Sequence, residues 1–142
     1  MRELKFRAWD TERKIMAQVN YLGLNDYEVG MKAKFENWNA PYPYVCKLMQ
    51  YTGLKDKNGK EIYEGDIIKV IRKHWNNCGK EHLEKIAEET GEVVFYKNLQ
   101  VSLKTKEKEG TLYQPFLWIF ADEEDCEIEI IGNVYENKDL LK

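Results

Sequence analysis

Basic side chains interleaved with aromatic rings near the start of the chain are the first residues whose types and spacing point to chemistry. Rings stack on bases and cations pair with phosphates, so this mixture occurs at sites that bind single-stranded nucleic acid. Acidic side chains dilute the group, and a strand with one solvated face gives the same pattern, which is the interpretation we favour. The candidate contact residues are Arg2, Lys5, Arg7, Trp9, Arg13 and Lys14, with Lys69, Arg72 and Lys73 as further candidates.

Histidine and cysteine residues spaced four apart are a second feature of interest, because imidazole and thiolate both bind zinc. His74, Cys78 and His82 would share one face of a helix. The amide and glycine residues between them disfavour an unbroken helix, and the local sequence supplies no fourth ligand. Segment 56–61 fails the calcium-loop template, since its glycine comes too early. We therefore expect no metal site and no cofactor.

Catalysis needs a nucleophile, a base or a metal held within mutual reach. The chain has two histidines and three cysteines, and they are scattered. No nucleophile, phosphate-cradle or metalloprotease motif is recognisable. Glu61, Glu64 and Asp66 lie close together in sequence, but residues at strand turns are commonly acidic for solubility. The sequence predicts that the protein is not an enzyme.

The elements that must position these residues are clearest in the middle of the chain. Asn58-Gly59 predicts a tight turn, because both residue types tolerate positive φ. Segments 45–52 and 67–71 on either side read as strands, with a second turn at 64–66. A further strand led by glycine follows at 91–96. This succession of short strands is typical of small SH3-like barrels.

The start of the chain predicts a hairpin. Apolar and polar residues alternate over 3–9, the period of two expected when one face of a strand is packed. The polar segment 10–14 supplies a turn, and 15–19 returns as the partner strand. The basic residues named above therefore belong to a β-hairpin.

Two prolines mark the predicted boundary between lobes. Pro41 and Pro43 each remove a backbone donor and push the preceding residue toward an extended conformation. Segment 25–39 before them has aromatic residues without a clean period, and we assign it no state. We expect a β lobe over 1–44 and a barrel-like β lobe over 45–142, packed as one compact unit.

One surface helix is predicted around 77–90. Leu83, Ile86 and Ala87 form a narrow apolar stripe among lysine and glutamate residues. Asn77 is a candidate cap, and the glycine at position 91 would end the helix. Such a helix would lie on the surface with one edge docked. It would be a helical insertion in the second lobe.

An aromatic stretch near the end of the chain favours self-association. Phe116, Trp118 and Phe120 would lie on one face of a strand, and Leu117 and Ile119 on the other. A strand that is apolar on both faces is covered by a sheet, by the other lobe or by another subunit. We expect a homo-oligomer that contacts its partner copy through this surface.

Composition limits the classes of partner. The net charge of −3 argues against a general binder of nucleic acid or anionic membranes, which would carry a basic excess. No run of eighteen apolar residues and no secretory leader is recognisable. We expect a protein that stays inside the cell, makes no membrane contact and keeps its cysteines reduced.

Three blocks of the sequence together resemble the YopX family of bacteriophage and prophage proteins. They are Leu48 to Val70, the opening Phe6-Arg7-Ala8-Trp9-Asp10, and the ending Glu129 to Leu141. The resemblance implies a phage or prophage origin, the cytoplasm of a bacterial host, a mostly β architecture and self-association. It implies no catalytic or binding residues. Segments 73–90 and 102–110 match no motif of the family.

These observations predict a mainly β (α+β) protein with small antiparallel sheets, an SH3-like barrel-type C-terminal part and one surface helix around 77–90. We expect a phage or prophage accessory protein that acts as a non-catalytic protein-binding or oligomeric module. The alternative is a nucleic-acid-binding protein of phage DNA metabolism or regulation, which would bind single-stranded DNA in a strongly salt-dependent way.

Overall fold

The structure, a computed structural model, confirms a mainly β fold built from antiparallel sheets with almost no helix. It describes residues 4–19, 22–25, 28–33, 46–76, 82–97, 100–107, 110–116 and 125–142. No helix in these segments is long and apolar enough to cross a membrane.

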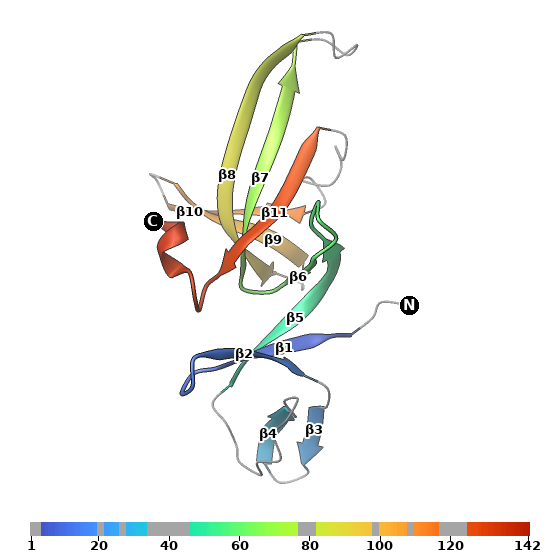
Figure 1. Ribbon diagram of the computed structural model, residues 1–142, viewed down its shortest axis with the longest axis vertical. Coiled ribbons are helices and arrows are strands. Elements are labelled where there is room, and N and C mark those ends of the chain that lie inside the picture. Colours follow the sequence, from blue (N-terminus) through green and yellow to red (C-terminus); the bar gives the residue numbers. More distant parts are fainter. Residues whose placement is uncertain are drawn as a thin grey trace.

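The first sheet has four strands in the order β2-β1-β5-β6 (Figure 1). Its strands are β1 (Phe6–Asp10), β2 (Ile15–Val19), β5 (Cys46–Lys55) and β6 (Glu61–Tyr63). The predicted N-terminal hairpin is therefore confirmed, and Asp10 closes its turn by accepting backbone hydrogen bonds from Glu12 and Arg13. A separate two-stranded sheet joins β3 (Leu22–Asn25) to β4 (Glu28–Ala33).

The second sheet has five strands in the order β10-β9-β8-β7-β11 and curls into a half-barrel (Figure 1). Its strands are β7 (Asp66–Trp75), β8 (Leu83–Tyr96), β9 (Gln100–Glu107), β10 (Gly110–Pro115) and β11 (Cys126–Asn133). Gly91 directly precedes the segment of β8 that pairs with β9. An added Cβ there would meet the Lys104 backbone oxygen at 2.8 Å, so the close approach of β9 requires glycine.

Each sheet has its own group of buried side chains. The concave face of the half-barrel holds the larger cluster, which consists of Ile62, Ile68, Val70, Val93, Leu103, Phe116 and Ile128. The smaller cluster is mostly aromatic and lies against the first sheet; it consists of Trp9, Met49, Tyr51 and Tyr63. Strand β6 contributes to both, through Ile62 and Tyr63, so it ties the two packed regions together.

Both predicted turns in the central segment are confirmed. Gly59 has φ +81° between β5 and β6, and Gly65 has φ +78° between β6 and β7. Positive φ is the left-handed region that glycine adopts without strain. Asp56 stabilises the first turn, since its side chain accepts hydrogen bonds from the backbone N–H groups of Asn58 and Lys60.

The surface helix predicted around 77–90 is wrong over 83–90, where the chain forms the first half of β8. Residues 77–81 lie outside the described part of the chain. The helix prediction rested on the apolar stripe, but pairing with β7 determines the conformation of this segment. Its glutamate side chains form ion pairs with cations of β7. Lys69 contacts Glu88 at 2.6 Å, and Arg72 contacts Glu89 at 2.9 Å. Cross-strand ion pairs of this kind stabilise a sheet.

The predicted lobe boundary at residue 44 lies outside the described residues and stays a prediction. Strands on the two sides of this boundary are hydrogen-bonded to each other, because all of β1 pairs with the first half of β5. The short 3-10 helix η1 (Lys138–Leu141) follows Asn137 near the end of the chain.

Candidate functional site

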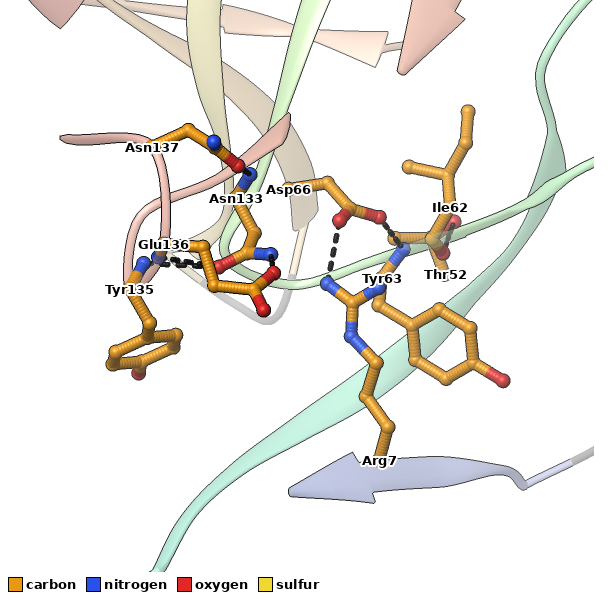
Figure 2. Close-up of polar contacts among 9 residues, drawn as sticks. All are labelled: Arg7, Thr52, Ile62, Tyr63, Asp66, Asn133, Tyr135, Glu136 and Asn137. Atoms are coloured by element: carbon orange, nitrogen blue, oxygen red, sulfur yellow. Dashed lines mark hydrogen bonds and ion pairs between the residues drawn. The ribbon is translucent and has the colours of Figure 1, made fainter. Parts of the chain in front are cut away.

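One predicted nucleic-acid contact residue of β1, Arg7, lies in a polar junction between the two sheets (Figure 2). Arg7 reaches from β1 to Asp66 at the start of β7, with Nη2 2.5 Å from Oδ1. The other oxygen of Asp66 accepts a hydrogen bond of 2.8 Å from the Tyr63 backbone N–H. The Arg7 guanidinium also lies over the Tyr63 ring, 4.8 Å from its centroid. This arginine is therefore held by a buried acid and an aromatic face.

A second ion pair lies beside the first. Lys5 Nζ is 2.7 Å from Glu61 Oε1, and the Tyr63 hydroxyl donates a 2.8 Å hydrogen bond to the other oxygen of Glu61. Lys5 thus joins the β1 side of the junction to β6. The paired cations of Lys5 and Arg7 mean that the junction carries no open excess of positive charge.

The electrostatics of the junction follow from burial and pairing. Burial raises the pKa of Asp66, although Arg7 opposes the shift. The hydrogen bond from Lys5 lowers the pKa of Glu61. Burial, together with the hydrogen bond to Glu61, raises the pKa of Tyr63 to about 12. The network is therefore built around ionised Glu61 and a phenol that keeps its proton.

The remaining predicted contact residues are placed as follows. Trp9 is buried and stacks on Tyr135, with ring centroids 5.8 Å apart. Arg13 pairs with Asp10 at 3.0 Å, and Lys14 is exposed in the hairpin turn with φ +60°. Arg2 lies outside the described residues. Trp9 thus belongs to the core, Lys5 and Arg7 to ion pairs of the junction, and Arg13 and Lys14 to the hairpin turn. The described residues of this group do not gather on one cationic surface.

The turn after β11 completes the junction (Figure 2). The Asn133 side-chain oxygen accepts hydrogen bonds of 3.0 Å from the backbone N–H groups of Tyr135 and Glu136. Asn137 accepts one from the Asn133 backbone N–H. These bonds fix the turn that presents Tyr135 to Trp9. The first sheet and the end of the chain are thereby packed together.

The aromatic residues predicted for self-association are only partly described. Phe116 is buried in the core of the half-barrel, where it packs in the larger cluster. Trp118 and Phe120 lie outside the described residues, so this prediction stays untested. Cys78 of the considered zinc set also lies outside them. In the described part of the chain, no three histidine, cysteine, aspartate or glutamate side chains gather as metal ligands.

The feature that sequence reasoning missed is a long arm formed by the outer halves of β7 and β8 (Figure 1). We define the arm as residues 71–75 of β7 and 83–89 of β8. The arm extends beyond β9, because β9 pairs only with Glu92 to Tyr96 of β8. It also extends beyond β11, whose pairing with β7 starts at Arg72.

One face of the arm carries exposed apolar side chains together with the charged side chains of Lys73 and Glu88. The register places Trp75 opposite Leu83, and Lys73 opposite Ile86. Side chains directly opposite each other share a face, so Trp75, Leu83 and Ile86 lie on the same side as Ile71. Leu83 is 45% exposed and Ile86 is 52% exposed. Trp75 is oriented by its indole N–H, which donates a 2.7 Å hydrogen bond to Asp125.

The outer edge of the arm is an unpaired strand edge. Strand β7 pairs with one side of β8 from Leu83 to Glu92, and no described strand pairs with the other side of residues 83–91. In an antiparallel sheet, every second residue of such an edge directs its N–H and C=O groups outward. Within the described segments, the edge therefore offers backbone hydrogen-bonding groups without a partner strand, next to exposed apolar side chains.

The family model described as YopX protein matches residues 5–142. This chain belongs to the YopX family. The match confirms the resemblance found in the sequence. No curated protein matches the chain.

Two crystal structures are similar to this member of the YopX family. Protein EF1440 from Enterococcus faecalis is 24% identical, with a TM-score of 0.51 and full coverage of both chains. Protein yopX from Bacillus subtilis is 23% identical, with a TM-score of 0.51 and full coverage of both chains. At these identities the likeness concerns the fold alone. The function of this YopX-family chain must therefore be argued from its own surfaces.

Proposed function

We propose that this protein is a non-catalytic accessory protein of a phage or prophage that acts as a protein-binding module, and that the arm is its contact surface. The observation that carries the proposal is the combination on one element of an open strand edge with exposed Leu83 and Ile86. Phage origin and a place in the cytoplasm of a bacterial host belong to the same proposal, and membership of the YopX family supports them.

The physical basis is β-strand addition. A partner strand laid along β8 would satisfy the outward backbone groups, and these main-chain hydrogen bonds supply affinity for any extended segment. Alternate side chains of the partner would reach the face of the arm that carries Leu83 and Ile86, which supplies preference for particular residues. Monomeric proteins commonly keep such edges short or covered, so an edge of this length indicates a partner.

The curl of the five-stranded sheet supports a related proposal, that the half-barrel is of the SH3-like type. The outer halves of β7 and β8 extend away from the curled part of the sheet (Figure 1), beyond the segment of β8 that pairs with β9. A partner can then bind the arm without disturbing the core. The half-barrel would serve as the rigid base of the binding element.

Nucleic-acid binding is the weaker proposal. Its sequence basis is the basic group on the N-terminal hairpin, and three of those cations, Lys5, Arg7 and Arg13, are paired with carboxylates. Trp9 is buried and unavailable for stacking on a base. Phosphate contact by these side chains would require the ion pairs to open.

The test compares arm variants in a pull-down from lysogenic cells treated with nuclease. Ile86→Lys changes the exposed face of the arm. Ile15→Lys is the matched control, because Ile15 lies on β2 and is 48% exposed against 52% for Ile86. We expect a protein captured by the wild type and by the Ile15 variant to be lost with the Ile86 variant. Equal capture by the wild type and both variants contradicts the proposal. Capture by the wild type that is lost when the lysate is treated with nuclease also contradicts it, because nucleic acid would then bridge the two proteins.

A further inference from the structure

We propose that the arm binds the free C-terminal end of another protein, as a strand that pairs along residues 83–89 of β8 and places its terminal carboxylate in a lysine-lined cavity beside η1. This inference rests on the proposed function, since it names the partner of the same surface. It adds a second recognition element, the cavity, to the open strand edge. The cavity determines where the bound strand ends and in which direction it runs.

The cavity has a volume of about 180 Å³ and lies where the arm meets the half-barrel. Thr90 of β8 lines it, together with Leu140 and Leu141 of η1. Its charged lining consists of one carboxylate and three ammonium groups, which belong to Glu92, Lys104, Lys106 and Lys142. Cationic groups beside leucine side chains suit a carboxylate that has an apolar side chain next to it.

Lys106 is the cation that is available to a ligand. It is exposed, and within the described segments its ammonium group has no ion-pair partner. The other two lysines already have partners, since Lys104 contacts Glu92 at 2.9 Å and Lys142 contacts Asp139. A carboxylate that enters the cavity would therefore form its ion pair with Lys106.

The open edge of β8 leads into this cavity. Strand β9 pairs with β8 only from Glu92 onward, and among the described strands the part of β9 after Lys104 pairs only with β10. Strands β8 and β9 therefore diverge, and residues 83–89 border the opening between them. Because alternate residues of a strand share a face, Ile86 and Thr90 lie on the same side of β8. A partner whose side chains follow Ile86 along that face reaches the cavity.

A strand bound to this edge cannot continue past the cavity. An added Cβ at Gly91 would meet the Lys104 backbone oxygen at 2.8 Å, so β9 lies close against β8 there. Helix η1 also contacts β8. The seven residues from 83 to 89 are enough for a strand, since strands commonly have about five or six residues. Beyond them the partner must end or turn away, and a chain terminus meets this requirement without a turn.

The charges select the direction of the bound strand. Strand β8 runs from Leu83 at the outer end of the arm toward Thr90 at the cavity (Figure 1). A terminal carboxylate in the cavity therefore requires a strand that is parallel to β8. A free N-terminus would require the antiparallel direction and would place its ammonium group among lysines. Parallel pairing is slightly less stable per residue, so the contacts of the carboxylate are needed to favour it.

Peptide pools test the role of the carboxylate. Randomised seven-residue peptides with free C-termini, and a matched pool with amidated C-termini, are each passed over the immobilised protein, and the retained sequences are identified by mass spectrometry. We expect the free-acid pool to yield sequences that end in an apolar residue. Amidation of such a peptide should raise its Kd by at least about tenfold, because it removes the charge that Lys106 binds.

Lysine variants test where the carboxylate lies. Lys106→Met should raise the Kd of the retained free-acid peptides by about fivefold, the effect of losing one exposed ion pair. Lys106→Arg keeps the charge and should bind these peptides like the wild type. Lys47→Met is the matched control, because Lys47 is an exposed lysine on β5 in the first sheet.

The possible results separate this inference from the proposed function. Absence of retained peptides, or a Lys106→Met variant that binds them like the wild type, overturns the inference. Equal retention of acid and amide peptides also overturns it and identifies an internal segment as the occupant. A dimer of the free protein that Ile86→Lys dissociates would identify a second copy instead. In each of these cases, a pull-down partner that depends on Ile86 leaves the proposed function standing.

Discussion

Arg7→Met is the substitution that most directly tests the polar junction. The change keeps most of the apolar stem of the side chain and removes the guanidinium that contacts Asp66 at 2.5 Å. Asp66 is 1% exposed, so its carboxylate cannot turn to bulk water once the arginine is gone. Breaking a buried ion pair by removing one partner costs about 3–5 kcal/mol, because an uncompensated charge stays buried. We expect a loss of that size at neutral pH, a large part of the stability of an ordinary domain.

The pH dependence gives the prediction a distinct signature. The folded-state pKa of Asp66 is raised above its ordinary value of 3.8, so the contribution of this group to stability is largest at low pH and declines as pH rises through the folded pKa. Without Arg7 that pKa rises further, since the arginine lowers it. The variant therefore loses more stability than the wild type between acidic and neutral pH. Near pH 4 the difference between the two proteins should shrink.

The assay is urea denaturation followed by tryptophan fluorescence at the two pH values. Lys69→Met is the control, because Lys69 pairs with Glu88 and both side chains of that pair are exposed, at 33% and 56%. Exposed pairs contribute about 1 kcal/mol or less. A second variant, Asp66→Asn combined with Arg7→Met, should recover part of the loss by removing the stranded charge. A loss below about 1 kcal/mol that is the same at both pH values would refute the reasoning.

Three further predictions concern the phenol of the junction and two glycines. In a spectrophotometric titration one tyrosine should ionise near pH 12, and Tyr63→Phe should abolish that step. Because folding raises the pKa of Tyr63, the contribution of this phenol to stability is full below pH 10 and is lost as pH rises toward 12. Gly91→Ala should destabilise by about 1–3 kcal/mol in thermal unfolding, since the new Cβ meets the Lys104 backbone oxygen. Gly59→Ala should lower the free energy of unfolding by only about 1 kcal/mol, since φ is +81° but an added Cβ would have no atom within 4 Å. A larger loss of stability for Gly59→Ala than for Gly91→Ala would contradict both predictions.

Several features of the fold could be predicted from the sequence because their causes are local. Asn58-Gly59 specifies a turn through the backbone freedom of its own residues, and the structure places Gly59 at positive φ. The alternation over 3–9 and the polar segment after it specify the first hairpin. The mainly β class and membership of the YopX family rest on such local signals repeated in order.

The candidate site could not be predicted in this way. The side chains of Arg7 and Asp66 are 59 positions apart, and only the meeting of two sheets brings them into contact. Lys69 and Arg72 stood out as cations, but their partners Glu88 and Glu89 were assigned to a helix.

Segment 83–90 shows the physical reason why the sequence could not predict which strands are neighbours. Its sequence satisfies the period of a helix, and it becomes a strand because β7 supplies hydrogen bonds and opposite charges along its length. Pairing of this kind is non-local, so no pattern within the segment records it. The sequence by itself determined the turns, the first hairpin and the family. The tertiary structure decided which strands are neighbours, and with them which edge of β8 has no partner among the described strands.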